Sequence, residues 1–146
     1  DRSAVRARTA PTLMTPHAGE AAALLGVSRE SVEAARLASA RELALRYGAT
    51  VLLKGSTTLV ADPAGGAVRV NPTGTAWLAT AGSGDVLSGL AGSLLAAGLS
   101  ALDAGSVGAY LHGLAGRLAA DGAPLGAHDV AAAIPEAWRD VRDALR

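Results

Sequence analysis

The apolar residues of the chain fall into short runs typical of strands and longer periodic stretches typical of helices. The short runs are rich in Val, Leu and Thr, and Gly, Pro and Asp separate them. The turn signal is strongest at Asp62-Pro63-Ala64-Gly65-Gly66, so we expect the runs on either side of it to form a hairpin. The predicted strands are residues 10–15, 50–54, 57–61 and 67–70.

In the remaining stretches apolar positions recur three or four residues apart, which predicts helices. We expect the charged residues of the second helix, Arg36 among them, to face solvent. Four glycines on the fourth helix indicate close packing against a neighbouring helix or sheet. This order of elements predicts an α/β layered fold whose sheet has an antiparallel part. The expected helices are residues 21–25, 28–47, 86–97, 100–121 and 137–145, with Pro135 separating the last from a short turn that starts at His128.

Composition narrows the class of protein. The 146 residues suffice for one domain, and a hydrophobic fraction of 50% with only 3% aromatics indicates a core of Ala, Val and Leu. Thirteen basic and 13 acidic residues cancel, and no basic patch with interleaved aromatics occurs, so we expect no nucleic-acid partner. The absence of Cys excludes disulfides and thiolate metal sites and fits a reducing compartment. The most apolar run, residues 86–102, is too short and interrupted for a membrane span.

The stretch Gly82-Ser83-Gly84-Asp85 is the strongest candidate for chemistry. Two glycines and a serine precede a carboxylate where a helix begins. Free backbone N–H groups and the positive end of the helix dipole make such a turn an anion site. Two interpretations of Asp85 stay open on these residues alone. It caps the helix, or it takes a proton from a group that attacks phosphate.

Two further polar stretches accompany it. In Lys54-Gly55-Ser56-Thr57-Thr58, at the end of a predicted strand, the lysine either holds phosphate or reaches along apolar surface to solvent. In Thr15-Pro16-His17-Ala18-Gly19-Glu20, the histidine either contacts a ligand or caps the next helix, and the glutamate either reaches Mg²⁺ through water or faces solvent. Ligands of open α/β sheets bind at strand ends, where all these stretches lie.

No motif of three well-known site types is present. The chain has no G-x-x-x-x-G-K-[ST] P-loop, no G-x-G-x-x-G after a strand and no G-x-S-x-G nucleophile elbow. His112 and His128 have no partners at metal-ligand spacing, so we interpret both as structural.

Together these stretches resemble the NAD(P)H-hydrate dehydratase family, which has the ribokinase-like three-layer α/β/α fold. The resemblance rests on T-P-H-A-G-E, L-K-G-S-T-T and N-P-T-G-T-A-W-L-A-T-A-G-S-G-D-V-L-S-G, followed by a Y-L-H-G helix and a closing segment to Pro135. It covers about Leu13 to Pro135 in the family's order. Ala18 departs from the pattern, because the family often has proline there.

The resemblance implies nicotinamide nucleotide repair by a lyase. ADP or ATP phosphorylates the ring hydroxyl of hydrated NADH or NADPH, and loss of phosphate restores the double bond. It implies that Asp85 is the catalytic base and that Asp85 and His17 contact the hydrate. It further implies that Glu20 and Asn71 organise Mg²⁺ through water. The implied nucleotide-binding residues are Lys54, Gly55, Ser56, Thr57, Thr58, Gly82, Ser83 and Gly84.

The resemblance also bears on the extent of the protein and its partners. The family's domain continues upstream, so we interpret residues 1–146 as its C-terminal portion, and the start without Met agrees. We therefore expect a cytoplasmic protein that self-associates or associates with its missing N-terminal part, with an epimerase domain sometimes fused to it. Two alternatives remain: a ribokinase-like kinase of a small vitamin precursor, and an inactive binding fragment.

Overall fold

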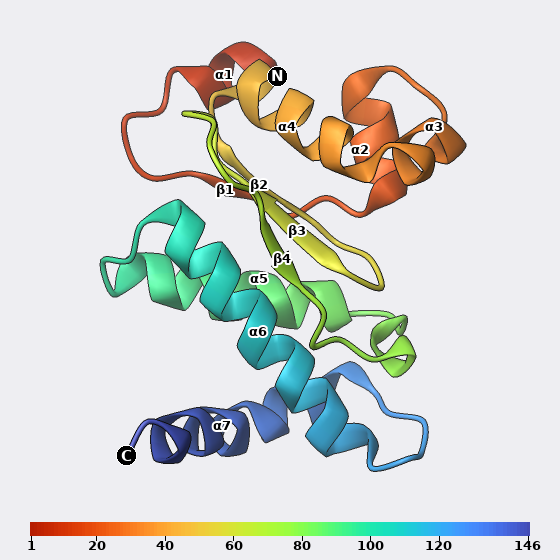
Figure 1. Ribbon diagram of the computed structural model, residues 1–146, viewed down its shortest axis with the longest axis vertical. Coiled ribbons are helices and arrows are strands. Elements are labelled where there is room, and N and C mark those ends of the chain that lie inside the picture. Colours follow the sequence, from red (N-terminus) through yellow and green to blue (C-terminus); the bar gives the residue numbers. More distant parts are fainter.

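The computed structural model describes residues 1–146 as three layers with a four-stranded sheet in the middle (Figure 1). Helices α1 to α4 cover one face of the sheet, and α5 and α6 cover the other, with α7 beyond α6. This confirms the α/β layered prediction. In chain order the elements are α1 (Arg2–Arg6), β1 (Leu13–Met14), α2 (Ala18–Leu25), α3 (Arg29–Ala34), α4 (Arg36–Tyr47), β2 (Thr50–Leu53), β3 (Thr58–Ala61), β4 (Arg69–Asn71), the 3₁₀ turn η1 (Ala76–Leu78), α5 (Ser83–Ala96), α6 (Ala101–Ala120) and α7 (Ala127–Ala144).

The sheet has the strand order β1-β2-β3-β4. β1 runs parallel to β2, whereas β2–β3 and β3–β4 are antiparallel, so the predicted hairpin around Asp62 is confirmed. The two central strands are buried on both faces because helices cover both sides. Val51 and Leu53 pack under α2 and α4, while Leu52 and Val60 face α5 and α6.

The glycines of α6 lie where the helix approaches its neighbours most closely. A side chain at Gly105 would meet Leu13 and Val60, one at Gly108 would meet Ala91, and one at Gly116 would meet Leu78. At Gly113 the added carbon would overlap Thr73 and the backbone of Gly74. The prediction that these glycines serve close packing is therefore confirmed.

Two expectations about helices were wrong. The stretch predicted as one helix, residues 28–47, breaks at Ala35, whose backbone (φ −136°, ψ 47°) leaves the helical region between α3 and α4. Pro135 lies inside α7 and does not end it, because Val130 and Ala137 on either side of it are fully buried in one cluster with Ala115 of α6. That packing outweighs a cost of about 3 kcal/mol for an interior proline. Helix α1 was not expected.

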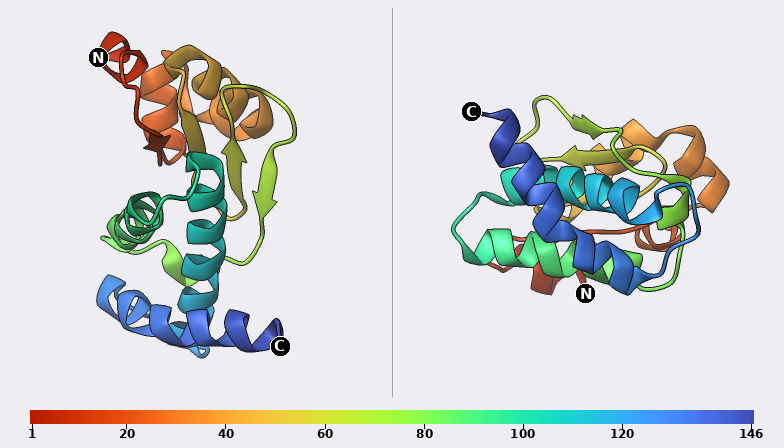
Figure 2. Two further views of the ribbon diagram at one scale, coloured as in Figure 1. Left: turned by 90° about the vertical axis from the view of Figure 1, so that its left-hand side faces the viewer. Right: turned by 90° about the horizontal axis from the view of Figure 1, so that it is seen from below.

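Two contacts hold the outer elements in place. Arg6 of α1 donates to the carbonyl oxygens of Leu45 and Arg46 at the end of α4. Arg69 of β4 donates to the carboxylate of Asp103 on α6 at 2.7 Å, and this bond lowers the pKa of Asp103. The views in Figure 2 show α6 lying between the sheet and α7, which runs across it. None of the helices is long and apolar enough to cross a bilayer.

Candidate functional site

The first turn of α5 has backbone donors that are not used inside the protein. Gly82, with φ +83°, adopts the left-handed conformation that favours glycine, and it ends the loop directly before the helix. The N–H groups of Ser83 and Asp85 donate to Thr80 and Gly82. Those of Gly82 and Gly84 have no acceptor in the chain. Two amides at a helix N-terminus are therefore available to an anion.

Asp85 is exposed in this first turn, and its carboxylate has no hydrogen-bond or ion-pair partner in the chain. No side chain caps the N-terminus of α5, since Gly82 occupies the capping position. The capping interpretation of Asp85 is therefore wrong. The carboxylate is unpaired and belongs to the same helical turn as the two unused amides.

Lys54 joins two of the three predicted stretches. It is the only lysine of the chain, and it follows β2. Its ammonium lies 3.8 Å from the Glu20 carboxylate, and the Nζ atom would be 2.9 Å from a carbon added at Gly84. The side chain is only 25% exposed, so it turns into the molecule rather than out to solvent. Lys54 therefore places one positive charge directly beside the start of α5.

The His17 stretch begins helix α2 through a reciprocal pair of hydrogen bonds. The Glu20 N–H donates to Nδ1 of His17 at 3.1 Å, and the His17 N–H donates to Glu20 Oε2 at 2.7 Å. This capping box fixes both side chains at the helix N-terminus. His17 thus caps its helix, while more than half of its side chain stays exposed and accessible to a ligand.

Asn71 and Thr58 are brought together by the sheet. The register of β3 and β4 pairs these two residues, so the stretch after Asn71 starts beside the Lys54-to-Thr58 stretch. The hydroxyl of Thr73 donates to the Asn71 side chain at 3.0 Å and lies 3.2 Å from the Tyr110 carbonyl oxygen of α6. Arg117 of α6 donates to the carbonyl oxygen of Pro72 at 3.0 Å, which holds this loop against the helix.

Arg36 has a role that sequence patterning missed. It was expected to face solvent, but its side chain is only 20% exposed. Its Nη2 donates to the carbonyl oxygens of Leu53, Lys54 and Thr57 at 3.1 to 3.4 Å. The helix break at Ala35 places Arg36 at the start of α4, beside the loop after β2. No pattern in the sequence distinguishes this arginine from the other arginines of the same helices.

His112 of α6 was interpreted from the sequence as structural, without an identified partner. Its side chain is buried, and Nε2 lies 2.9 Å from the carbonyl oxygen of Ser83 and 3.3 Å from the Ser83 hydroxyl oxygen. Burial lowers the pKa of His112, the hydrogen bond to Ser83 opposes that shift, and the nearby Lys54 charge adds to it. The signal that could have revealed it is a histidine on the apolar, glycine-rich face of a helix.

Ser83 itself differs from the expected arrangement. Its side chain points inward to His112 and the residue is buried, so its hydroxyl lies away from the surface where Gly84 and Asp85 are found. Gly55 and Ser56 are exposed, whereas Thr57 and Thr58 are half-buried. The backbone oxygen of Ser56 comes close to Gly74, which brings the second and third predicted stretches together.

An open groove of about 460 Å³ lies beside β1 and the start of α2. Its lining includes Glu20, so the groove reaches the Lys54 side of the candidate site. The lining residues are Met14, Thr15, Pro16, Glu20, Ala23 and Leu24. Half of them are apolar, and β1 has only β2 as a neighbour in the sheet.

The side chains do not form a metal cage. No group of three or more His, Cys, Asp and Glu side chains is positioned to hold a metal ion. Glu20 is bound to the His17 N–H and lies near Lys54, and Asn71 accepts from Thr73. Mg²⁺ that is carried by phosphates needs only one or two carboxylates and keeps several waters, so this donor set fits a phosphate-borne ion.

Comparison with known proteins gives a consistent result. The family model described as NAD(P)H-hydrate dehydratase matches residues 1–136. The bifunctional NAD(P)H-hydrate repair enzyme of Mycobacterium leprae is 49% identical over 138 residues, which are 94% of this chain and 28% of that protein. The ADP-dependent (S)-NAD(P)H-hydrate dehydratase of Neisseria meningitidis is 46% identical over 133 residues, which are 91% of this chain and 45% of that protein.

A solved structure agrees with the fold. The ADP/ATP-dependent NAD(P)H-hydrate dehydratase from Bacillus subtilis, co-crystallised with ATP and Mg²⁺, superimposes with a TM-score of 0.83 at 32% sequence identity. The superposition covers 89% of this chain and 49% of that one. The fold is therefore ribokinase-like, and the chain spans half or less of the length of these relatives.

Proposed function

The chain belongs to the NAD(P)H-hydrate dehydratase family, and we propose that it supplies the phosphoryl-transfer part of an enzyme that dehydrates (S)-NAD(P)H hydrate to NAD(P)H with ADP or ATP. One observation carries the proposal. The ammonium of Lys54 lies against Gly84, whose N–H is unused, and the free carboxylate of Asp85 is the next residue along the chain. A cation, free amides and a base in one place are what transfer of a phosphoryl group to a hydroxyl requires.

Asp85 is the base in this mechanism. Hydroxide leaves poorly from the hydrated ring, whereas phosphate leaves well. The ring hydroxyl attacks the terminal phosphorus of the nucleotide, its proton passes to Asp85, and the bond from phosphorus to the bridging oxygen breaks. The shortened nucleotide leaves with the electrons of that bond. The phosphate then departs with the electrons of the carbon–oxygen bond, the adjacent ring carbon gives up a proton to water, and the electrons of its carbon–hydrogen bond form the double bond. A positioned general base contributes about 10²- to 10⁴-fold to such a step.

The residues around Asp85 bind the charge of the phosphates. The amides of Gly82 and Gly84 and the ammonium of Lys54 are the donors, and the helix dipole of α5 adds to them. The exposed Gly55 and Ser56 lie on the side of Lys54 where the rest of the nucleotide would extend, followed by Thr57 and Thr58. His17 faces the hydrate from the start of α2.

Bound Mg²⁺ would neutralise charge on the phosphates of the nucleotide. Glu20, more than half exposed at the edge of the site, would reach it through water. Asn71, paired with Thr58 in the sheet, would likewise hold it through water. Both assignments rest on the resemblance of these stretches to the family.

Two surfaces of the chain suggest its partners. The groove beside β1 borders a strand that has a neighbour on one side only, and the upstream part of the domain would extend the sheet there.

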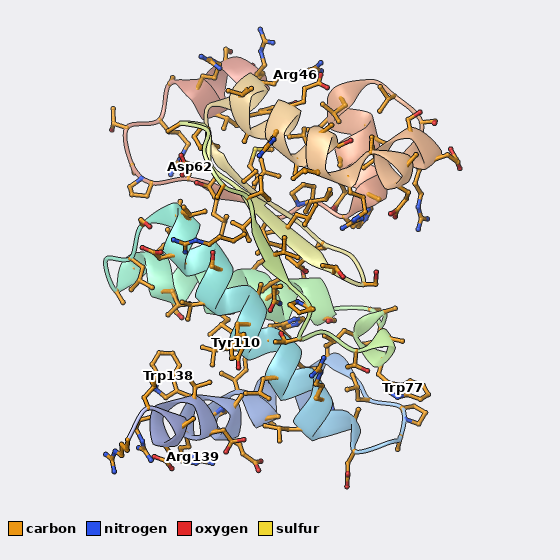
Figure 3. All side chains as sticks on the ribbon, in the orientation of Figure 1. Arg46, Asp62, Trp77, Tyr110, Trp138 and Arg139 are labelled. Carbon is orange, nitrogen blue, oxygen red and sulfur yellow. The ribbon has the colours of Figure 1, made fainter.

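At the other end of the molecule a groove of about 430 Å³ between α6 and α7 is lined mostly by apolar side chains, including Tyr110 and Trp138 (Figure 3). We assign it to a second copy of the chain, so that the protein is a homo-oligomer. A fused epimerase domain is a further partner, as the resemblance to the family implies, and the Mycobacterium leprae relative is bifunctional. The reaction takes place in the cytoplasm, where nicotinamide cofactors are used.

An assay that starts from NADPH hydrate, ADP and Mg²⁺ tests the proposal. Recovery of the absorbance of NADPH with release of phosphate supports the lyase. A stable phosphorylated alcohol would indicate a kinase of the same fold, and the absence of both would indicate a binding fragment. The full-length protein is the sample, because this chain spans at most half of its relatives.

The variant Asp85→Asn sharpens this test. We expect it to fold and to lose about 10³-fold in turnover, because the amide cannot accept the proton. Asp140→Asn, an exposed acidic residue of α7, is the control and should leave turnover unchanged. Near wild-type turnover in Asp85→Asn would show that another group is the base.

A further inference from the structure

We propose that His112 is a positioning residue that fixes the phosphoryl-binding turn at the start of α5 through Ser83. The inference rests on the proposed function of this turn and adds a residue from a different helix to the site. His112 does not touch the surface where substrates bind, since the residue is only 7% exposed. Its effect on the reaction must therefore pass through the residue that it contacts.

The direction of the hydrogen bond follows from chemistry. A carbonyl oxygen can only accept, so the 2.9 Å contact between His112 Nε2 and the Ser83 carbonyl requires a proton on Nε2. The Ser83 hydroxyl lies 3.3 Å from the same nitrogen and shares this donor. The ring is thereby held as the tautomer with the proton on Nε2, and the carbonyl and hydroxyl oxygens of Ser83 are both tied to α6.

Ser83 is the residue through which another helix holds this turn. Gly82 and Gly84 on either side of it have no side chain, and the Asp85 carboxylate has no hydrogen-bond or ion-pair partner in the protein. The other side chain that bonds to the turn, that of Ser88 to the Gly84 carbonyl oxygen at 2.9 Å, belongs to α5 itself. A turn built from glycines has wide backbone freedom unless another element restrains it. His112 supplies that restraint at the middle of the Gly-Ser-Gly sequence.

Fixing Ser83 also sets the direction in which its neighbours face. Successive residues of a helix point about 100° apart, since a turn contains about 3.6 residues. With Ser83 turned inward to His112, Gly84 meets Lys54 and Asp85 is exposed. A rotation of this first turn would move Gly84 away from Lys54 and would turn the Asp85 carboxylate with it.

The environment of His112 suits a neutral donor. Lys54 is the charged group near it, and a second positive charge beside that ammonium would be unfavourable. Burial, which disfavours the charged ring, acts in the same direction. A neutral imidazole can therefore hold the turn without competing with Lys54 for the arriving phosphate.

Three variants of the full-length protein test the inference. His112→Leu removes the donor and puts an apolar side chain of similar size in its place. His112→Gln instead offers an amide N–H near the position of Nε2. His128→Leu, on the exposed first turn of α7, is the matched control. We expect His112→Leu to lower kcat about 100-fold with a smaller change in the KM for ADP, because the turn is displaced when the phosphoryl group is transferred. We expect His112→Gln to recover most of kcat and His128→Leu to match the wild type.

A wild-type kcat in His112→Leu, or an equal loss in both His112 variants, would overturn the inference.

A spectroscopic measurement on the unmodified protein covers the case in which the variants do not fold. The ¹⁵N signals of the His112 ring should show a protonated Nε2 and an unprotonated Nδ1, and should shift when ADP is added. The opposite tautomer, or ¹⁵N signals that do not shift at saturating ADP, would contradict the positioning role of His112. If the protein lacks dehydratase activity but shows this tautomer and this shift, the proposed function fails and the positioning role stands.

Discussion

Lys54 and Glu20 form an ion pair of 3.8 Å between the end of β2 and the start of α2. The Glu20 carboxylate that meets the ammonium is itself fixed by the His17 N–H. Lys54 is thus directed toward the α5 turn from a position that α2 defines, and three separate stretches of the chain meet at one positive charge.

Replacing Lys54 by Met should raise the KM for ADP about 10- to 100-fold, since a charge-assisted hydrogen bond to phosphate is lost. Stability should change by less than about 1 kcal/mol, because an ion pair at this degree of exposure contributes little. Steady-state kinetics and urea unfolding measure the two effects. Arg29→Met, at an exposed arginine of α3, serves as the control for removal of a positive charge, and an unchanged KM in Lys54→Met would remove Lys54 from the nucleotide site.

Because Lys54 is the only lysine, the wild type offers an independent check. Within residues 1–146 an amine-reactive reagent can modify only the side chain of Lys54. Saturating ADP should slow this modification in the full-length protein, and an unchanged rate would mean that bound ADP does not cover Lys54. Peptide mass mapping would show which amine is protected.

Arg36→Met should destabilise the loop that carries Gly55 and Ser56. Three backbone carbonyl oxygens lose their donor at a largely buried position, which predicts a loss of about 1–3 kcal/mol in the free energy of unfolding. The KM for ADP should rise as well, because the loop is no longer held. Arg29→Met is again the control. If Arg36→Met matches it in both measurements, the three hydrogen bonds do not hold the loop.

Gly113→Ala should destabilise the protein, whereas Gly92→Ala should not. A methyl group at Gly113 would overlap Thr73 and the loop that follows Asn71, and overpacking of this kind costs about 1–3 kcal/mol. Gly92 lies on α5 with open space around it, so alanine there should stabilise by up to about 1 kcal/mol through helix propensity. Urea unfolding of both variants checks the difference. Equal effects would mean that α6 and the loop can separate at little cost.

The wild type should lose stability on acidification more steeply than His112→Gln. The pKa of folded His112 lies below its ordinary value of 6.5, so on acidification the unfolded chain takes up this proton first. Stability is therefore fully present above about pH 6.5 and is lost as the pH falls toward the folded pKa. Urea unfolding at several pH values between about 7 and 5 measures the free energy of unfolding of both proteins. Parallel curves for the two proteins would show that His112 titrates normally.

Trp138→Glu should weaken self-association. Trp138 is 49% exposed and lines the groove between α6 and α7, where a charge opposite a second copy would be costly. The other tryptophan, Trp77, is similarly exposed but lies on η1 outside the groove, so Trp77→Glu is a matched control. Sedimentation velocity should show a higher dissociation constant for Trp138→Glu only. The same oligomer in both variants would assign the groove to another partner.

The sequence was informative where local physics decides the structure. Turn chemistry at Asp62 gave the hairpin, and the spacing of apolar residues gave the strands and most helices. The stretches around His17, Lys54 and Gly84 were expected to meet because strand ends of one sheet lie together, and the structure brings them together. The roles of their residues in catalysis remain predictions.

What the sequence could not show are the contacts made across the fold. Arg36 and His112 act on residues that are distant in the chain, and only the packed helices reveal which carbonyl oxygens they reach. Pro135 misled for the same reason, since the packing of α7 on α6 outweighs the local preference for a break. The capping interpretation of Asp85 failed because glycine occupies the capping position.

The loops of the site are anchored mainly by their main chain. Arg36 holds carbonyl oxygens after β2, Arg117 holds that of Pro72, and His112 holds that of Ser83. None of these hydrogen bonds involves the side chain of Ser56 or Pro72, whereas a side chain at Gly55 would collide with the Arg36 guanidinium. Substitution at Ser56 or Pro72 can therefore change the chemical surface that these loops present without releasing their paths, and a laboratory seeking a new nucleotide preference for this scaffold could randomise those two positions first.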